Sequence, residues 1–320
     1  MKNRRVYEWA PPPRPPLSDL FGGAPSRRGW INYWVWGKLQ DGAYIVMYRL
    51  LSVLPIDFVS DFGAWLGWLV VRNFKPQTLA NARRNFRRLR PRWSEAEIEA
   101  ACERLYRHIG RIMTEFCCLT RMAGAGRLHL VNTRVLTDAV KSGPVIIVSL
   151  HTGNWESGAS ALTTLGLTWG DFYTPPPSET QHRIANEIRH TFGITMLPPG
   201  MAGVRPAIRM LKDGGAISIF CDEVHYDRVM APFFGRPPHI DGNLAITIRL
   251  ARMTGAKIII GYTVRKQGCN FDVFFEATPD LPPASGAPGQ LLADVALLNA
   301  AIEPIIDRHV DQWYFLDNDF

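Results

Sequence analysis

A histidine and a glutamate stand five residues apart in the segment His151-Thr152-Gly153-Asn154-Trp155-Glu156. The ordinary pKa of histidine lies near neutrality, so its ring can take a proton from a hydroxyl group and later return it. A carboxylate on the other ring nitrogen fixes the tautomer and stabilises the imidazolium. A turn with the backbone freedom of Gly153 lets the two side chains meet. The pattern favours a general base with an orienting acid; a core histidine with satisfied hydrogen bonds is the alternative.

The elements around this segment have the pattern of a sheet covered by helices. The short β-branched run Val145–Leu150 is typical of a strand buried on both faces, and His151 follows its carboxyl end, where open α/β sheets collect reactive groups. Further strands are expected near residues 169–173, 216–220, 257–264 and 272–275, and helices near 157–165, 179–192, 203–212 and 290–310. This alternation predicts an α/β fold with a mainly parallel sheet flanked by helices.

Three regions are expected along the chain. Residues 1–29 are rich in proline and arginine and predict a flexible arm, since they have little to bury. Residues 30–74 predict two amphipathic helices broken at Pro55, and residues 75–320 the α/β domain. That domain begins with a basic helix over 76–92, and a capping box of Ser94 and Glu97 opens a helix over 95–122.

The helix pair at 30–74 is dense in tryptophan and tyrosine. Charged residues interrupt every run of about 18 residues that a single membrane-spanning helix would need. The aromatic residues favour helices that lie in the membrane interface. They are Trp30, Tyr33, Trp34, Trp36, Tyr44, Tyr48, Trp65 and Trp68. An ordinary amphipathic pair packed on the domain is the alternative.

Positive charge is concentrated in one place. The chain has a formal net charge of +7, and residues 83–92 hold six arginines and no acid. Such a block favours a polyanionic partner, namely lipid headgroups, nucleic acid or an acidic protein, and a solvated helix face is the alternative. A non-catalytic binding protein that uses this block is a second functional hypothesis. No nucleic-acid-binding motif is present in the sequence, so nucleic acid is not expected as a partner.

Several other chemistries lack their sequence signals. The five cysteines contain no Cys-x-x-Cys pair, so neither a disulfide scaffold nor a zinc framework is expected, and buried free thiols are the simplest interpretation. There is no Gly-x-Ser-x-Gly elbow, no P-loop and no His-Glu-x-x-His motif. We therefore expect neither a nucleophilic serine nor a bound metal.

The segment His151–Glu156 resembles the His-x4-Asp/Glu box of the bacterial lipid A biosynthesis (lauroyl/myristoyl) acyltransferase family and of its relatives that acylate phosphatidylinositol mannosides. Other stretches are similar to further family motifs and follow in the family's order. They are Asn81–Phe86 with Ser94–Glu97, Ile188–Gly193, Asp222 with Ala231–Pro237, and Gly242 with Ala251–Ala256. Together the matches cover about residues 30–315.

The resemblance implies a glycerolipid acyltransferase-like fold with membrane-associating helices at its N-terminal side. It implies that His151 is the general base and Glu156 its orienting partner. His151 would take the proton from an acceptor hydroxyl as that oxygen attacks an acyl thioester, so no acyl-enzyme and no cofactor are needed. The donor would be acyl-carrier protein or acyl-CoA, and the enzyme would work at the cytoplasmic side of the inner membrane as a peripheral or monotopic protein.

Four further residues are candidates for binding substrate. Arg189 and Asp222 match family positions thought to shape the site, and Arg189 would suit a headgroup or phosphopantetheine phosphate. A surface arginine and a loop-capping carboxylate are the respective alternatives. Glu223 rivals Asp222, and backbone N–H groups near Asn154 are the expected oxyanion donors.

The resemblance implies a hydroxyl of a lipid A precursor or related glycolipid as the acceptor. The sequence departs from the family's usual pattern in residues 223–227 and after Gln312-Trp313, where the stretch up to Asp319 is acidic. A different acceptor, such as a phosphoglycolipid or an amino-lipid, therefore stays open at this point.

Overall fold

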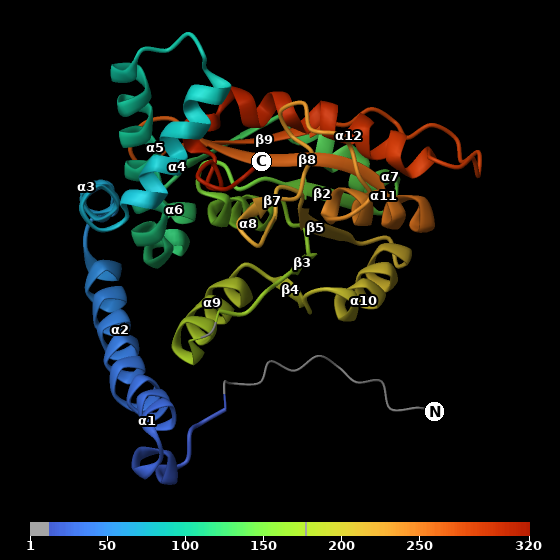
Figure 1. Ribbon diagram of the computed structural model, residues 1–320. Coiled ribbons are helices and arrows are strands. Elements are labelled where there is room, and N and C mark those ends of the chain that lie inside the picture. The colour runs from blue at the N-terminus through green and yellow to red at the C-terminus, as the bar shows by residue number, and fades with distance from the viewer. Residues whose placement is uncertain (1–12, 177) are drawn as a thin grey trace, which may run out of the picture.

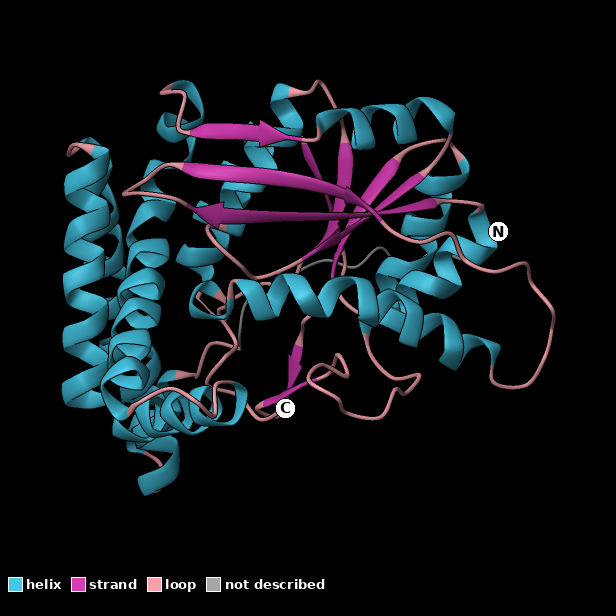
Figure 2. Cartoon of the chain, turned by 90° about the horizontal axis from the view of Figure 1, so that it is seen from above, coloured by secondary structure: helices cyan, strands magenta, loops and turns pink. Residues whose placement is uncertain are grey.

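The computed structural model describes residues 13–176 and 178–320 and contains a seven-stranded sheet between two layers of helices (Figures 1 and 2). Its strand order is β1-β9-β8-β2-β5-β3-β4. The strands are β1 (Leu128–Val131), β2 (Val145–Ser149), β3 (Trp169–Phe172), β4 (Ile194–Leu197), β5 (Ala216–Phe220), β8 (Lys257–Arg265) and β9 (Phe271–Ala277). Only the β8–β9 pairing is antiparallel within this sheet. The expected α/β fold with a mainly parallel sheet is confirmed.

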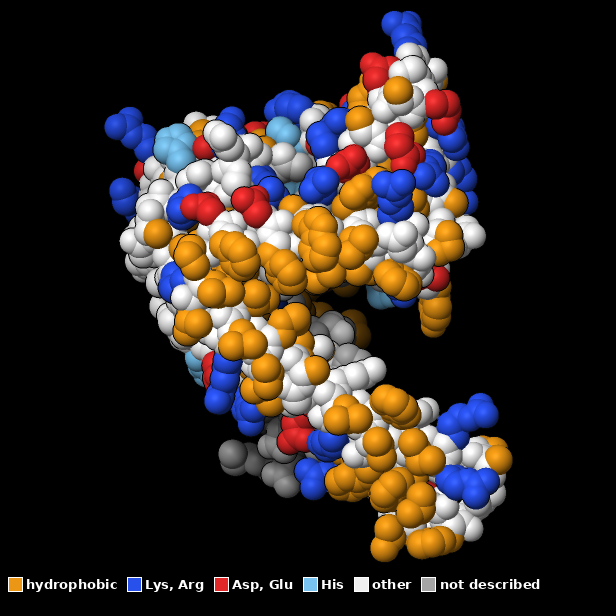
Figure 3. All heavy atoms as spheres, turned by 90° about the vertical axis from the view of Figure 1, so that its left-hand side faces the viewer, with side chains coloured by type: hydrophobic (Ala, Val, Ile, Leu, Met, Phe, Trp, Pro, Cys, Tyr) orange, Lys and Arg blue, Asp and Glu red, His pale blue; other side chains and the backbone are white. Residues whose placement is uncertain are grey.

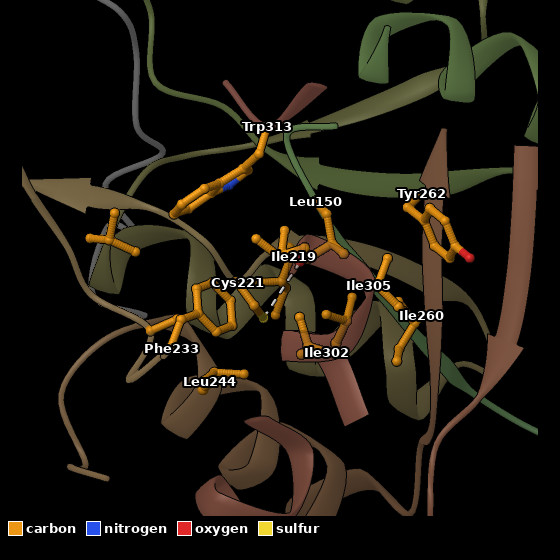
Figure 4. Close-up of a cluster of buried hydrophobic side chains, with 14 of the residues drawn as sticks. Leu150, Ile219, Cys221, Phe233, Leu244, Ile260, Tyr262, Ile302, Ile305 and Trp313 are labelled. Atoms are coloured by element: carbon orange, nitrogen blue, oxygen red, sulfur yellow. Dashed lines mark hydrogen bonds between the residues drawn. The ribbon is translucent and has the colours of Figure 1, made fainter. Parts of the chain in front are cut away.

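Strand β2 lies in the centre of the sheet because both of its faces are apolar. Ile146 and Val148 belong to the cluster beneath α10 (Met201–Lys212), α11 (Asn243–Thr254) and α12 (Gln290–Arg308), part of which Figure 4 draws. Val145 and Ile147 belong to the opposite cluster, beneath α7 (Thr133–Ser142), α8 (Trp155–Thr164) and α9 (Glu179–Thr191). This two-sided core fixes the strand whose end carries His151.

The strands expected from the sequence are all present, and the structure adds the edge strands β1 and β4 and the helices α7 and α11. A two-stranded antiparallel ribbon, β6 (Val224–His225) and β7 (Arg228–Val229), follows β5. The helix expected over 95–122 is interrupted. It consists of α5 (Glu95–Glu115), a 3₁₀ turn (Phe116–Cys118) and α6 (Leu119–Gly124). The capping box of Ser94 and Glu97 at the start of α5 is confirmed.

The N-terminal region is more helical than expected. Residues 1–12 of the expected flexible arm lie outside the described residues, but the rest of it includes a 3₁₀ turn (Leu17–Phe21) and most of α1 (Ala24–Ile31). A π-helical turn (Asn32–Gly37) connects α1 to α2 (Lys38–Val53), and α3 (Ile56–Phe74) follows the predicted break at Pro55. Within residues 13–176 and 178–320, no helix combines the length and the apolarity needed to span a membrane.

Helix α3 packs on α5 with its backbone in close approach. A Cβ atom added to Gly67 would lie 2.4 Å from the carbonyl oxygen of Tyr106, and one added to Gly63 would lie 2.5 Å from that of Gly110. Only glycine allows this approach. Other side chains of α3 remain exposed, namely Phe58, Trp65, Leu69, Val70 and Phe74. Figure 3 shows hydrophobic side chains gathered along this side of the molecule.

The arginines of α4 (Pro76–Leu89) and of the turn after it are largely paired within the chain. The ion pairs are Arg83–Glu99, Arg84–Asp319, Arg87–Glu95 and Arg90–Asp307, with N–O distances of 2.5–2.8 Å. Arg88 donates to the backbone oxygen of Phe320. Five of the six arginines thus bind acids or backbone of the protein itself, and a polyanionic partner for this block stays a prediction.

Candidate active site

His151 lies at the rim of the sheet, two residues beyond the end of β2, and its ring lines a cavity of about 650 Å³. Strand β5 is the parallel neighbour of β2, and Ser149 is paired in register with Phe220. Residues 151 and 222 are each two positions further along, so they leave the sheet side by side. The strand register thus brings His151 next to Asp222, although the two are 71 residues apart in the sequence.

The carboxylate of Asp222 holds the histidine ring. Its Oδ1 lies 2.8 Å from Nδ1 of His151, and its Oδ2 accepts hydrogen bonds from the backbone N–H of His151 at 2.8 Å and from Nε1 of Trp313 at 2.9 Å. Because a carboxylate oxygen accepts, Nδ1 carries the proton, and Nε2 is left as the basic nitrogen. Asp222 is fully buried, and the side chain of His151 is 18 % exposed. The pair has the geometry of a general base with its orienting acid.

The expectation that Glu156 orients His151 is wrong, because Asp222 occupies Nδ1. Helix α8 begins at Trp155, so Glu156 already belongs to its first turn. There its Oε1 accepts a hydrogen bond from Nη2 of Arg189 at 3.2 Å, and both residues line the cavity. The sequence indicated Glu156 because it is near His151 along the chain, whereas the carboxylate that binds the ring, Asp222, follows the end of the neighbouring strand.

Asn154, expected near the substrate, is buried and does not line the cavity. Its amide donates to Glu115 at 2.8 Å, and Glu115 also accepts two hydrogen bonds from Arg265. Burial opposes ionisation of Glu115, but the charge and hydrogen bonds of Arg265 prevail and lower its pKa. Asn154 thus holds the turn that follows His151 on the side away from the cavity.

His108 supports the same turn. Arg265 donates from Nε to Nδ1 of His108 at 3.0 Å, so Nε2 of His108 carries a proton and donates to the carbonyl oxygen of Gly153 at 3.1 Å. Burial lowers the pKa of His108 to about 3, so the ring is neutral. Gly153 itself has φ +54° and packs against the backbone of Thr263, where a Cβ would lie 2.4 Å from the carbonyl oxygen.

Two carboxyl groups in the cavity are poorly solvated. Burial raises the pKa of Asp171 to about 7, and it raises that of Glu223 to about 7 as well. Oε1 of Glu223 accepts from the backbone N–H of Asn243 at 2.6 Å. Oδ1 of Asp171, Oε2 of Glu223 and Nη1 of Arg189 are buried with no hydrogen-bond partner among the described residues. All three residues line the cavity.

Asp171 was not foreseen from the sequence, although an acid between Trp169 and Phe172 in a buried strand was a signal. Asp222, expected to bind substrate, is absent from the cavity lining and contacts His151 instead. Glu223 and Arg189 do line the cavity, as Glu156 does. The structure therefore brings four of the six sequence-predicted residues to one cavity, counting His151, and places Asp222 and Asn154 behind it.

A large part of the remaining cavity wall is apolar. Side chains from the sheet face beneath α8 meet side chains of α8 itself, and the small residues Gly158 and Gly261 leave space between them. The apolar lining includes Ile147, Ala159, Leu162, Trp169, Ile194, Val273 and Phe275. The cavity thus combines an apolar compartment with a polar end that carries a basic imidazole.

Residues 32–320 match the family model described as bacterial lipid A biosynthesis acyltransferase. The chain belongs to this family. The resemblance seen in the sequence motifs is therefore confirmed, and membership assigns to this acyltransferase the transfer of an acyl group from a donor to a lipid acceptor. Members of the family are membrane-associated. A search of the curated proteins finds no match to the chain.

Proposed function

We propose that this acyltransferase moves a fatty acyl chain from a thioester donor to a hydroxyl group of a glycolipid, with His151 as general base. Nε2 of His151 takes the hydroxyl proton while the oxygen attacks the thioester carbonyl. The tetrahedral intermediate collapses, the C–S bond breaks, and the imidazolium returns the proton to the leaving thiolate, giving an ester and a thiol. The observation that supports this is the His151–Asp222 pair at the end of a cavity with an apolar wall.

The polar end of the cavity suits the acceptor and the donor phosphate. Arg189 lines the cavity with its Nη2 bound to Glu156, and its guanidinium group suits a phosphate or a sugar hydroxyl. Asp171 and Glu223 also line the cavity, and their carboxyl groups suit further hydroxyl groups of the acceptor. One polar atom of each of these three side chains has no hydrogen-bond partner among the described residues, so a ligand group that reached these atoms would supply the missing hydrogen bonds.

The apolar compartment suits the acyl chain. Its wall comes from the face of the sheet beneath α8, so a chain whose carbonyl lies at His151 would extend along buried side chains. Burial stabilises each methylene group by about 0.8 kcal/mol. Such a compartment also keeps water away from the thioester while His151 acts.

The exposed hydrophobic side chains of α2 and α3 suit a membrane surface. They include Leu39, Val46, Met47, Leu50, Val53, Trp65 and Phe74, and Trp36 in the turn before α2 is exposed as well. Figure 3 shows hydrophobic side chains gathered on the side of the molecule where these helices lie. Tryptophan is favoured at the level of the lipid headgroups, and an exposed apolar surface of this extent calls for a partner. We propose that α1–α3 lie on the cytoplasmic face of the inner membrane, where lipid substrates enter without crossing water.

The donor is acyl-carrier protein or acyl-CoA, and the acceptor is a lipid A precursor or a related glycolipid. No cofactor or metal takes part in this proposal, since the base and the activated thioester supply the chemistry. The acidic stretch up to Asp319 departs from the family's usual sequence pattern, and it leaves a phosphoglycolipid or an amino-lipid as the alternative acceptor. An amino-lipid would give an amide instead of an ester, so the product's lability to mild base separates the two.

The test is a transfer assay with the purified full chain in mild detergent. Wild type and His151→Ala receive each labelled donor together with an inner-membrane lipid extract, and the lipid masses are followed. We expect wild type to add one acyl group to a hydroxylated glycolipid, and His151→Ala to lose about 10²- to 10⁴-fold in rate. Equal transfer by the two proteins would refute the role of His151.

A further inference from the structure

Trp313 is fully buried beside the catalytic pair. It follows α12 and a 3₁₀ turn (Val310–Gln312), and its ring packs against Phe233, Phe234 and Phe320 at centroid distances of 5.8–6.0 Å. Figure 4 shows it in the same core as Phe233 and Cys221. Its indole N–H donates to Oδ2 of Asp222 at 2.9 Å. Oδ2, the oxygen that does not bind the histidine ring, thus accepts a hydrogen bond from a side chain 91 residues further along the chain.

The residues after Trp313 surround His151. We call Trp313–Phe320 the tail segment. The backbone N–H of Tyr314 donates to the carbonyl oxygen of His151 at 2.9 Å, and Trp313 forms a β-bridge with Thr152. The ring of Phe315 stands edge-on to the imidazole at 4.7 Å, and the ring of Tyr314 lies 5.1 Å from that of Trp155. The tail segment therefore contacts the backbone and the ring of the base, as well as its acid.

Helix α4 holds the tail segment in place. The buried amide of Asn85 donates two hydrogen bonds, to the carbonyl oxygens of Leu316 at 2.6 Å and Asn318 at 2.7 Å. Arg84 forms an ion pair with Asp319, and Arg88 donates to the backbone oxygen of Phe320. Asn85, Arg84 and Arg88 thus donate hydrogen bonds to backbone and carboxylate oxygens of the tail segment. The basic helix is thus used to fix a segment that reaches the active site.

We propose that Trp313 is a positioning residue for acyl transfer, held by the grip of α4 on the tail segment, and that it keeps Asp222 in the orientation that aims His151 at the substrate. The proposal rests on the proposed function of the His151–Asp222 pair. Asp222 binds the ring with one oxygen and needs donors on the other to keep its plane fixed. Without the indole N–H, the backbone N–H of His151 is the one donor to Oδ2 that remains among the described residues. The carboxylate can then rotate, and the ring moves with it.

Trp313→Phe removes the N–H group and keeps an aromatic ring. We expect kcat to fall about ten- to a hundred-fold, in line with small misplacements of catalytic groups, while KM for both substrates stays within about twofold, because Trp313 does not line the cavity. Trp93→Phe is the matched control, since Trp93 stacks on Phe86 at 6.0 Å and does not line the cavity. An unchanged kcat in Trp313→Phe would overturn the proposal.

A double variant separates positioning from loss of packing. In the background of Asp222→Ala, we expect Trp313→Phe to cause no further loss of kcat, because the indole acts only through that carboxylate. A second loss of the same size as in the wild-type background would show that Trp313 acts through packing alone, and would overturn the proposal.

A readout independent of turnover distinguishes failure of this proposal from failure of the proposed function. In protein labelled with ¹⁵N at the indole nitrogens, the signal missing from Trp313→Phe identifies Trp313. We expect that signal to lie at low field in wild type, to shift upfield in Asp222→Ala and to stay in place in Arg87→Gln. If the chemical shift of the Trp313 indole is the same in Asp222→Ala as in wild type, the hydrogen bond is refuted, whether or not any acyl transfer is found.

Asn85 and Arg87 test the grip of α4. Asn85→Asp replaces the amide donor by a carboxylate that repels two carbonyl oxygens, so we expect the Trp313 signal to shift and kcat to fall at least fivefold with KM maintained. Arg87→Gln removes a different arginine of α4, whose exposed ion pair is with Glu95 at the start of α5, and is expected to change neither. Wild-type behaviour of Asn85→Asp in both measurements would remove α4 from the proposal.

Discussion

Asp171 makes the stability of the folded protein depend on pH, and the sign follows from its burial. Desolvation raises the pKa of this carboxyl from 3.8 to about 7 in the folded state. Between these two values the folded state binds more protons than the unfolded state, so the free energy of unfolding falls as pH rises. The stabilising contribution of the neutral acid is present at low pH and is lost by about pH 8. Asp171→Asn keeps the shape of the side chain and removes its ionisable carboxyl group.

The size of the effect follows from the pKa shift. A shift of about three units corresponds to roughly 4 kcal/mol in total, at 1.36 kcal/mol per unit. Part of this change in the free energy of unfolding has already occurred below pH 5, because the unfolded carboxyl is ionised by then. Between pH 5 and pH 8 the contribution of Asp171 is therefore about 2.5 kcal/mol. Most single changes alter stability by about 0.5–3 kcal/mol, so a difference of this size is measurable.

The assay is denaturant unfolding in mild detergent at pH 5, 6, 7 and 8. We expect the free energy of unfolding of Asp171→Asn, measured relative to wild type, to rise by about 2.5 kcal/mol between pH 5 and pH 8. Asp138→Asn on the exposed face of α7 is the matched control, and its difference from wild type should be flat. Parallel pH curves for wild type and Asp171→Asn would refute the reasoning.

Three other predictions concern the acyl compartment, the apolar side and the helix contact. Ala159→Phe fills space beneath α8, so the preferred donor should become shorter in a chain-length series; an unchanged preference would place the chain elsewhere. The double variant Phe58→Ser, Trp65→Ser removes two exposed rings and should reduce sedimentation with anionic vesicles several-fold, whereas undiminished binding would contradict a membrane contact at α3. Gly67→Val forces α3 away from α5 and should lower the free energy of unfolding by about 1–3 kcal/mol. Gly124→Ala is the control, because a Cβ atom there meets open space and should be near-neutral. A near-neutral effect of Gly67→Val would disprove the close contact.

The central strands were predictable because burial on both faces leaves a strong local signal. Val145–Leu150 is such a run, and its carboxyl end correctly located His151 at the rim of the sheet. The edge strands β1 and β4 were missed because they are short and alternate with exposed residues such as His129 and Thr195. Their pairing depends on neighbours that no local pattern reveals.

The partner of His151 was not predictable from local spacing. Asp222 reaches the ring only because β5 lies beside β2 in a fixed register, and strand order is a property of the whole sheet. The arginines of α4 and of the turn after it present the same difficulty, because Arg84 and Arg90 pair with acids 235 and 217 residues away. Composition indicated a basic helix, but only the fold shows that its charge is used inside the chain.

The most direct test of the account is the single-turnover rate of acyl transfer by Asp222→Asn. The variant keeps the shape of the side chain but alters the group that holds Nδ1 of His151. Asp294→Asn is the matched control, because Asp294 is equally buried, pairs with Arg252 at 2.6 Å and does not line the cavity. We predict a loss of about 10²- to 10⁴-fold for Asp222→Asn, and a rate within twofold of wild type for Asp294→Asn. Transfer at the wild-type rate by Asp222→Asn would contradict the assignment of the catalytic pair.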